Sequence, residues 1–242
     1  MARIGIIGSA GRMGQALADA IAAAGEVHAG GVDKGDDVLA LARVSDVLVD
    51  FSAPAALEGN LDAAMEAGVP IVVGTTGLEE RHHWLCDNAA EQIAVLQTGN
   101  TSLGVNLLAA LVEQAASRLG DDWDIEIVEM HHRHKVDAPS GTALLLGQAA
   151  ARGRNVDLAT AKVSGRDGIT GAREAGSIGF AALRGGSVAG DHQVIFATDN
   201  ERIELGHRAD NRTIFARGAV KAALWLKGQA KGRYDMKGVL GL

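Results

Sequence analysis

The stretch "RIGIIGSAGRMGQAL", residues 3–17, places three glycines between a short apolar run and an alanine-rich segment. The apolar run predicts a buried strand at Arg3–Ile7, and the segment after the glycines predicts a helix at Met13–Ala24. Gly8, Gly11 and Gly14 follow a G-x-x-G-x-x-G spacing. Glycines at such a turn let the backbone approach a pyrophosphate, and the following helix offers it unpaired N–H groups. The stretch predicts the start of a dinucleotide-binding sheet, although an ordinary turn in a glycine-rich chain is an alternative.

The alternation of apolar and alanine-rich segments continues after this turn. Further buried strands are predicted at Val27–Val32, Val47–Phe51, Val69–Val73 and Ile93–Gln97. Helices are predicted at Ala55–Ala67 and Leu78–Glu91, and the weakly periodic link Asp33–Val47 predicts one shortened helix or a loop. Alternation of this kind predicts a parallel sheet with helices on both faces.

The second half of the chain has a different pattern. We predict helices at Leu103–Leu119 and Ser140–Arg152, a strand at 122–130, and strands and turns from Lys162 to Ile214. In that last region "RGGS" (184–187) and "TDNE" (198–201) are typical of hairpin turns. The tail 215–229 is helical in pattern and can fold back onto the first domain.

These patterns together predict an α/β protein with two domains. An N-terminal Rossmann-like parallel sheet is followed by a second α+β domain that contains a mixed or largely antiparallel sheet. We expect residues 1–102 plus 212–242 to form the dinucleotide-binding domain. Residues 103–211 are expected to form the substrate-binding and oligomerisation domain.

Composition and charge exclude several classes of function. Hydrophobic residues make up 47% and charged residues 22% of the 242 residues, and the formal net charge is −7 without a basic tail. With only 3% aromatic residues as well, nucleic acid is not an expected partner. No apolar run is long enough to cross a bilayer, and the N-terminus lacks the pattern of a signal peptide. A single cysteine excludes an intrachain disulfide, so we expect a protein of the reducing cytoplasm without a membrane partner.

An acidic residue ends the second predicted strand. Asp33 follows the glycine turn by about 20 residues, where a carboxylate binds the adenosine ribose hydroxyls of NAD. The next residue, Lys34, supplies a cation for the 2′-phosphate of NADP. We therefore predict that both NADH and NADPH bind, the alternative being that "DKGDD" (33–37) is a solvated loop.

Small polar residues follow three further predicted strands, in "DFSAP" (50–54), "GTTG" (74–77) and "TGNTSLG" (98–104). Ligands of open α/β sheets bind beyond the carboxyl ends of the strands. Gly74, Thr75 and Thr76 are therefore predicted to line the cofactor site, and the segment 98–101 to lie near the nicotinamide. Because strand-end loops are usually polar, the prediction depends on the three loops together.

The stretch "EMHHRHKVDAPSGTALLL", residues 129–146, gathers histidines and cations before a predicted helix. In a strand or in a helix, His131 and Lys135 share one face, whereas His132 joins them in an irregular turn. A histidine exchanges protons near neutral pH, and a neighbouring lysine supplies a cation or a proton. Either residue is therefore a candidate proton donor.

An anion site is predicted directly after this cluster. Ser140 is a natural N-cap, and Gly141 and Thr142 open a helix whose N–H groups can hold a carboxylate together with Lys135. A solvated basic loop and a histidine-bound zinc ion are the alternatives. Zinc is disfavoured because Arg133 and Lys135 would add positive charge beside the ion, so no metal site is assigned. His82 and His83 lie on a predicted helix without an anion site and are interpreted as surface or interface residues.

In these features the chain resembles the 4-hydroxy-tetrahydrodipicolinate reductase (dihydrodipicolinate reductase) family. The segment "EMHHRHKVDAPSGTAL" resembles the family signature E-x-H-H-x-x-K-x-D-x-P-S-G-T-A. "GxxGRMG", "VDFS", "GTTG", N-x-S-x-G-V-N, "IGFAALRGGSVAGDHQVIF" and "FARGAVKAALWL" support it in the same order along nearly the whole chain. The family reduces the cyclic product of the preceding synthase of lysine biosynthesis, so the resemblance implies an NAD(P)H-dependent oxidoreductase.

The resemblance also implies roles for individual residues. His131 matches the proton donor or acceptor and Lys135 a proton donor, while substrate contacts fall on His132, Gly141 and Thr142, with the N-cap Ser140 beside them. Cofactor contacts fall on Gly8, Ser9, Ala10, Gly11, Arg12, Met13, Asp33, Lys34, Gly74, Thr75, Thr76, Thr98, Gly99, Asn100 and Thr101. Hydride is expected to reach C4 of 4-hydroxy-tetrahydrodipicolinate as its hydroxyl leaves as water, giving tetrahydrodipicolinate on the diaminopimelate route to lysine. A dicarboxylate substrate and a homotetramer built through the second domain's sheet are implied as well.

Two other classes of function are compatible with a dinucleotide-binding sheet. A semialdehyde dehydrogenase with an acyl-enzyme step needs a nucleophilic cysteine, and Cys86 lies within a predicted helix away from the site. An NAD-sensing regulatory module would need neither His131 nor Lys135, and a DNA-binding segment is absent from the chain.

Overall fold

The structure is a computed structural model that describes residues 1–242. It divides into two compact units, here called unit 1 and unit 2. Unit 1 contains Met1–Leu103 and Thr213–Leu242, and unit 2 contains Gly104–Arg212. Unit 2 is therefore inserted into the sequence of unit 1. None of the helices combines the length and hydrophobicity needed to cross a membrane.

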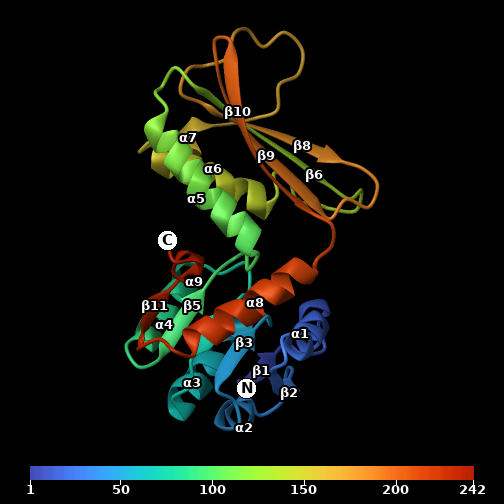
Figure 1. Ribbon diagram of the computed structural model, residues 1–242, viewed down its shortest axis with the longest axis vertical. Helices are drawn as coiled ribbons and strands as arrows, with labels where there is room; N and C mark the ends of the chain where they lie inside the picture. The colour runs from blue at the N-terminus through green and yellow to red at the C-terminus, as the bar shows by residue number, and fades with distance from the viewer. The chain divides into compact units, whose positions relative to one another are not determined.

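Unit 1 is built on a six-stranded sheet in which every pair of neighbouring strands is parallel (Figure 1). The strand order is β11-β5-β4-β3-β1-β2. The strands are β1 (Arg3–Ile7), β2 (Val27–Val32), β3 (Val47–Asp50), β4 (Ile71–Val73), β5 (Ala94–Gln97) and β11 (Gly232–Tyr234). The predicted Rossmann-like parallel sheet is thus confirmed. The strand order changes direction between β1 and β3, which is where such sheets bind ligands.

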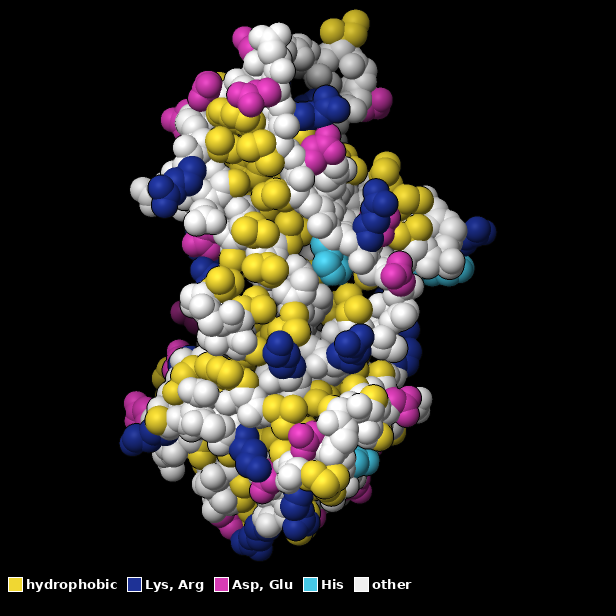
Figure 2. All heavy atoms as spheres, in the orientation of Figure 1, with side chains coloured by type: hydrophobic (Ala, Val, Ile, Leu, Met, Phe, Trp, Pro, Cys, Tyr) yellow, Lys and Arg dark blue, Asp and Glu magenta, His cyan; other side chains and the backbone are white.

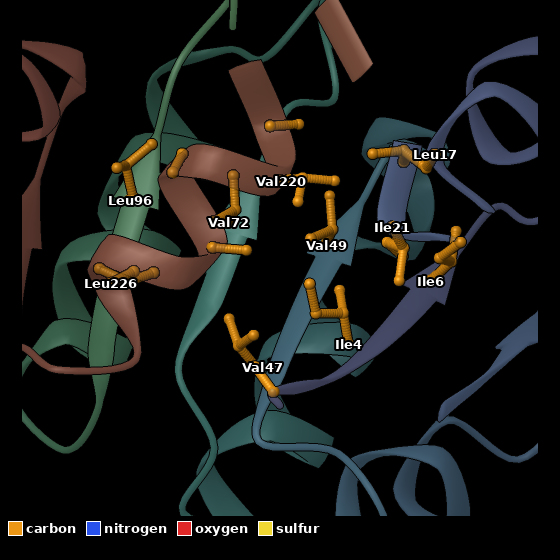
Figure 3. Packing of buried hydrophobic residues seen from close by; sticks show 14 of the residues in the cluster. Ile4, Ile6, Leu17, Ile21, Val47, Val49, Val72, Leu96, Val220 and Leu226 are labelled. Atoms are coloured by element: carbon orange, nitrogen blue, oxygen red, sulfur yellow. The ribbon is translucent and has the colours of Figure 1, made fainter. Parts of the chain in front are cut away.

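Helices cover both faces of this sheet. On one face α1 (Arg12–Ala23), α8 (Thr213–Leu226) and α9 (Met236–Leu240) pack against the strands. On the other face lie α2 (Val38–Arg43), α3 (Leu57–Ala67, preceded by the 3₁₀ turn Pro54–Ala56) and α4 (Glu80–Ala90). Figure 3 shows Leu17 and Ile21 of α1 and Val220 of α8 within the first of these cores. Leu17 and Ile21 are one helical turn apart and fully buried, and burial of each such side chain contributes about 1.5–3 kcal/mol.

Unit 2 is a five-stranded mixed sheet backed by helices on one face (Figure 1). The strand order is β10-β9-β6-β8-β7, with β9 antiparallel to both β10 and β6, and β8 parallel to both β6 and β7. The strands are β6 (Asp124–His131), β7 (Lys162–Ser164), β8 (Ile178–Arg184), β9 (Gly190–Thr198) and β10 (Glu201–Ala209). The helices are α5 (Leu103–Arg118), α6 (Gly141–Gly153) and the short α7 (Leu158–Ala161).

The two faces of the unit 2 sheet differ in burial. In β6, residues alternate strictly between buried and half-buried, as expected for a strand with one covered face. Ile125, Ile127 and Phe196 belong to the core between the sheet and the helices. On the opposite face Val128 and Met130 stay half-buried and Leu183 is 50% exposed. This second set, together with Ile195 of β9, is called the open face below.

One predicted turn is wrong and another is confirmed. "RGGS" at 184–187 does not close a hairpin, because β6 lies between β8 and β9 in the sheet. The chain that leaves β8 must therefore cross β6 before β9 pairs on the other side of β6. "TDNE" does connect the antiparallel pair β9 and β10, and Asn200 takes the positive φ of 68° that such tight turns require.

Hydrophobic side chains also gather on the outer surface of α5 (Figure 2). Leu107 and Leu111 lie one helical turn apart on this surface and are each 43% exposed. Their neighbours Leu108 and Val112 belong to the core of unit 2, and Val105 is buried as well. The helix is therefore hydrophobic around most of its circumference.

Candidate active site

The glycine turn lies at the carboxyl end of β1, where the strand order changes direction. Gly8 has a φ of 85°, and a Cβ there would lie 2.7 Å from the carbonyl oxygen of Phe51. Gly14 packs so close to the turn that its Cβ would lie 2.4 Å from the carbonyl oxygens of Gly8 and Ser9. The N-cap of α1 is Gly11, and no side chain caps the helix. The first N–H groups of α1 are therefore left for an anionic ligand, which fits a dinucleotide pyrophosphate.

Asp33 is tied to the glycine turn. Its Oδ2 accepts hydrogen bonds from the Ser9 hydroxyl at 2.7 Å and from the Ala10 N–H at 2.9 Å. The position of Gly31 makes room for this contact, since a Cβ there would lie 2.4 Å from the Ser9 Cβ. Oδ1 of Asp33 remains for a ribose hydroxyl, and the adjacent Lys34 is exposed.

The other strand-end residues also lie at the carboxyl edge of the unit 1 sheet. Gly74, Thr75 and Thr76 follow β4, and Thr98, Gly99, Asn100 and Thr101 follow β5. Thr75 and Thr101 are buried, and their hydroxyls donate to Asp50 Oδ1 (3.3 Å) and to the Phe215 carbonyl (2.7 Å). Contacts from these two residues to a cofactor would therefore come from their backbone.

A buried carboxylate organises these loops. Asp50, at the end of β3, is fully buried and accepts from the Ser52 N–H at 2.8 Å and the Asn60 amide at 3.1 Å, in addition to Thr75. It thus joins the loop after β3 to the loop after β4. The sequence placed Asp50 in a strand-end motif but did not indicate that its side chain points inward.

The histidine cluster begins where β6 ends. His131 is the last residue of β6 and is buried, and residues 132–139 form an irregular turn with a cis peptide bond between Ala138 and Pro139. Lys135 therefore lies in neither a strand nor a helix, and the predicted shared face with His131 does not apply. Its Nζ pairs with Asp137 Oδ1 at 2.8 Å, which lowers the pKa of that carboxyl group. Arg133 and His134 are exposed to solvent.

The N-terminus of α6 follows this turn directly. Ser140 is the N-cap, as predicted, and its hydroxyl accepts from the Ala143 N–H at 3.2 Å. Gly141 and Thr142 are the first two residues of the helix. The Ser140 N–H donates to Glu129 Oε1 at 3.1 Å, and the same carboxylate contacts His131 through Oε2. The two halves of the predicted site are therefore held together in unit 2.

A further cation faces the cluster. The pKa of His132 lies below its ordinary value because of desolvation and then because of the positive charges of Arg212 and His134. Arg212 is the last residue of unit 2, 80 positions after His132 in the numbering, and the sequence pattern did not single it out. Its charge adds to that of Lys135, which suits an anionic ligand.

Three residues of the site were not identified from sequence. Glu129 is 1% exposed, and Arg184 holds its carboxylate with two hydrogen bonds of 2.9 Å each. His192 is buried and its Nε2 lies 3.1 Å from the Ser140 hydroxyl. Strand periodicity could have placed Glu129 beside His131, since both occupy the same face of β6. Arg184 and His192 come from other strands, whose register the sequence pattern did not give.

The metal-site and acyl-enzyme alternatives can be compared with the positions of the side chains. No group of three or more His, Cys, Asp or Glu side chains is arranged to hold a metal ion. His82 belongs to the N-terminal capping box of α4, and His83 contacts Gln97 at 3.0 Å. Cys86 is fully buried in the core under α4, and burial raises the pKa of its thiol. A buried, protonated thiol does not serve as an acyl-enzyme nucleophile.

Comparisons with known proteins agree across both units. Sequence models of the family described as "Dihydrodipicolinate reductase, N-terminus" and "Dihydrodipicolinate reductase, C-terminus" match residues 2–101 and 104–240. A 4-hydroxy-tetrahydrodipicolinate reductase from Zymomonas mobilis is 59% identical over 247 residues, covering 99% of this chain and 97% of the relative. The enzyme of the same name from Acidiphilium cryptum is 53% identical over 241 residues, covering 99% of this chain and 98% of the relative.

A solved structure shows that the fold is shared as well. A dipicolinate-bound dihydrodipicolinate reductase from Paenisporosarcina sp. TG-14 superposes with a TM-score of 0.76 at 22% identity, covering 97% of each chain. At that identity the likeness concerns the fold alone, and the sequence matches carry the assignment. The chain therefore belongs to the dihydrodipicolinate reductase family.

Proposed function

We propose that this chain reduces 4-hydroxy-tetrahydrodipicolinate to tetrahydrodipicolinate with NADH or NADPH, on the diaminopimelate route to lysine. The observation that carries the proposal is the site of unit 2, in which Glu129 joins a buried histidine to the N-terminus of α6. A proton-transfer group and an anion-holding group lie side by side there. Family membership over both units supports the same reaction.

Unit 1 is proposed to hold the cofactor. The uncapped N-terminus of α1 faces the pyrophosphate, Asp33 the adenosine ribose, and the loops after β4 and β5 the nicotinamide. The bound nucleotide supplies a hydride. Residues of the protein fix the groups that are proposed to bind the cofactor. The Ser9 and Ala10 contacts hold the Asp33 carboxylate against the turn, and the hydrogen bonds of Asp50 hold the loops after β3 and β4.

Unit 2 is proposed to hold the dicarboxylate substrate. One carboxylate meets the N-terminus of α6 at Ser140, Gly141 and Thr142, where the helix dipole favours a negative charge. Lys135 and His132 add positive charge and hydrogen-bond donors. A protein of the same fold is described as dipicolinate-bound, and dipicolinate is itself a dicarboxylate.

The reaction needs a proton as well as a hydride. Loss of the C4 hydroxyl as water leaves a conjugated C=C–C=N system, and a hydride added at C4 sends an electron pair toward the ring nitrogen. A donor within hydrogen-bond reach neutralises that developing charge. His131 and Lys135 are proposed as the donor pair, with the proton restored from solvent after each turnover.

A coupled assay tests the proposal. The product of the preceding synthase is supplied, and the oxidation of NADH and of NADPH is followed separately. We expect both to be consumed in proportion to tetrahydrodipicolinate formed. If neither NADH nor NADPH is oxidised, the proposed substrate is rejected.

Lys34→Ala is expected to raise the KM for NADPH by at least about tenfold, equivalent to about 1.4 kcal/mol, and to leave the KM for NADH unchanged. The exposed Lys34 ammonium stands next to Asp33 and offsets the repulsion between that carboxylate and a 2′-phosphate. Steady-state kinetics with both nucleotides measures the effect, with Lys231→Ala, another exposed lysine of unit 1, as the control. Equal effects on both nucleotides would contradict the role, and a wild-type preference beyond about a thousandfold, about 4.1 kcal/mol, would contradict dual use.

Unit 2 is also proposed to assemble the chain into a homotetramer in the cytoplasm. Helices cover one face of its sheet, and the open face presents Val128, Met130, Leu183 and Ile195 without a covering layer. Hydrophobic side chains left partly exposed on a sheet face, here interspersed with Glu126, Gln193 and Asp191, are a common site of association. Another copy of the same sheet is the proposed covering layer.

Leu183→Glu is expected to convert the tetramer into smaller species. In the assembled form the new carboxylate would be buried without a partner. Burying an unpaired charge costs on the order of several kcal/mol, here once per subunit. Size-exclusion chromatography with light scattering gives the mass. Val44→Glu, which places the same charge at a hydrophobic residue that is 42% exposed in unit 1, is the control. A monomeric wild type, or a tetrameric Leu183→Glu variant, would contradict the proposal.

A further inference from the structure

One buried carboxylate joins three segments of unit 2. Glu129 of β6 is 1% exposed and has four hydrogen-bond donors around it. Its Oε2 contacts His131 Nδ1 and accepts from Arg184 Nη1 at 2.9 Å. Its Oε1 accepts from Arg184 Nη2 at 2.9 Å and from the Ser140 N–H at 3.1 Å. Each oxygen of the Glu129 carboxylate therefore has two hydrogen-bond partners.

The sheet register brings these groups together. Glu129 and His131 lie two residues apart on the same face of β6, and His131 pairs directly with Arg184 of the parallel strand β8. Arg184 also donates from Nη2 to the Asp137 carbonyl and from Nη1 to the Leu183 carbonyl, each at 2.6 Å, so both terminal nitrogens of the guanidinium are held. A buried carboxylate without such a partner would be strongly destabilising.

Glu129 is ionised in this setting. Burial by itself would raise the pKa of Glu129, but the hydrogen bonds from Arg184 and His131 outweigh it and hold the pKa below its ordinary value. An ionised carboxylate can only accept hydrogen bonds. The contact with His131 therefore requires a proton on Nδ1, which in the neutral ring leaves Nε2 as the basic atom.

The surroundings of His131 allow one ring orientation. The His192 ring stands edge-on to it, with ring centroids 5.0 Å apart and planes at 75°. Burial and then the positive charge of His131 lower the pKa of His192 to about 4, so His192 is neutral near pH 7. On the Nε2 side lies Gly190, where a Cβ would approach Nε2 to 3.0 Å. A ring flip about the Cβ–Cγ bond would put Cδ2 in the place of Nδ1 and break the contact with Glu129.

We propose that Glu129 is a positioning residue that fixes His131 as the Nδ1–H tautomer and holds Ser140 in register with it. Arg184 keeps the carboxylate ionised and in place. Nε2 of His131 is thereby the atom that exchanges the catalytic proton, at a set distance from the helix end that holds the substrate carboxylate. The inference rests on the proposed function for its kinetic consequence, but the tautomer itself does not depend on the substrate.

The first test is made on the wild-type protein. With ¹⁵N-labelled histidine, neutral His131 is expected to show a protonated Nδ1 and an unprotonated Nε2 in NMR spectra that correlate ring nitrogens with ring protons. The His131 signals are assigned by comparison with His131→Gln. A neutral ring protonated on Nε2 would overturn the inference without any variant at Glu129.

Glu129→Gln provides the second test. The amide keeps the volume but turns one acceptor into a donor, so either His131 Nδ1–H or the Ser140 N–H loses its acceptor. We expect kcat to fall by at least about a hundredfold, with an unchanged Kd for NADH, and the His131 tautomer to shift toward Nε2–H. Glu129→Asp keeps the charge and is expected to recover part of kcat and the Nδ1–H signal. Wild-type kcat in Glu129→Gln with an unchanged tautomer would overturn the inference.

Glu126→Gln is the matched control. Glu126 lies on the same strand and is also held by arginines, Arg166 and Arg173, but it faces away from His131. Its substitution is expected to leave the His131 tautomer and kcat unchanged, and an equal loss of kcat would reduce the role of Glu129 to general stability. If the wild type shows the Nδ1–H tautomer but does not turn over the synthase product, the proposed substrate fails while the positioning of His131 stands.

Discussion

Lys135→Ala is expected to lower kcat by at least about a hundredfold while leaving the Kd for NADH unchanged. Lys135 supplies the cation nearest to the N-terminus of α6 in the sequence and is half-buried in the turn after β6. Alanine removes both its charge and its transferable protons from the proposed substrate site. The residues proposed to bind the cofactor all belong to unit 1, so binding of NADH should not respond.

The structural cost of this substitution is small, which makes the kinetic result interpretable. The partner of Lys135 is Asp137, whose side chain is 54% exposed and can be solvated by water when the lysine is absent. Steady-state kinetics with the synthase product measures kcat, and a fluorescence titration with NADH measures the Kd. Arg133→Ala removes an exposed cation two residues earlier and should retain wild-type kcat. Wild-type kcat in Lys135→Ala would refute the proposed role.

Gly14→Ala and Gly11→Ala are expected to fail in different ways. At Gly14 the new Cβ would lie 2.4 Å from two backbone carbonyl oxygens. This clash is relieved only if the glycine turn moves away from α1. Overpacking of this kind costs about 1–3 kcal/mol, so the melting temperature should fall and NADH binding with it. At Gly11 the nearest atom is the Gly8 carbonyl oxygen at 3.3 Å, so the fold should tolerate the methyl group.

The methyl group at Gly11 would nevertheless stand at the uncapped end of α1, where the pyrophosphate is proposed to bind. We expect Gly11→Ala to keep the wild-type melting temperature and to weaken NADH binding. Thermal unfolding and NADH titration of both variants separate the two effects. Gly25→Ala, at a turn with open space around it but a φ of 72°, controls for the backbone cost of replacing a glycine in unit 1. Unchanged NADH binding in Gly11→Ala would argue against the proposed cofactor site.

Much of unit 1 could be predicted because its strands are buried and separated by helices. The predicted bounds of β1 and β2 match the structure, and β1 is a short, mostly buried apolar run that ends at the glycine turn. The three-residue β11 was missed because its strand conformation depends on pairing with β5, from which it is distant in sequence. The wrong hairpin at 184–187 has a similar cause: turn residues indicate a change of direction, not which strand is the neighbour.

The site divides in the same way. The helix N-cap at Ser140 follows from local chemistry and was predicted, whereas the geometry of Lys135 was not, because periodicity cannot describe an irregular turn. Glu129 stands two residues before His131 in the same quoted stretch, but the sequence pattern indicated no role for its side chain. Arg184 lies 55 residues after Glu129, and their contact depends on the parallel register of β6 and β8.

The insertion of unit 2 into unit 1 has a consequence for synthesis of the chain. The ribosome delivers residues 104–212 before 213–242, so unit 2 has all its strands while unit 1 still lacks α8, β11 and α9. Until α8 arrives, Ile4, Val49 and Val72 on one face of the first sheet have no covering helix from it. Premature termination after Arg212 therefore leaves a finished second half attached to an exposed hydrophobic sheet, the kind of surface that chaperones and proteases recognise.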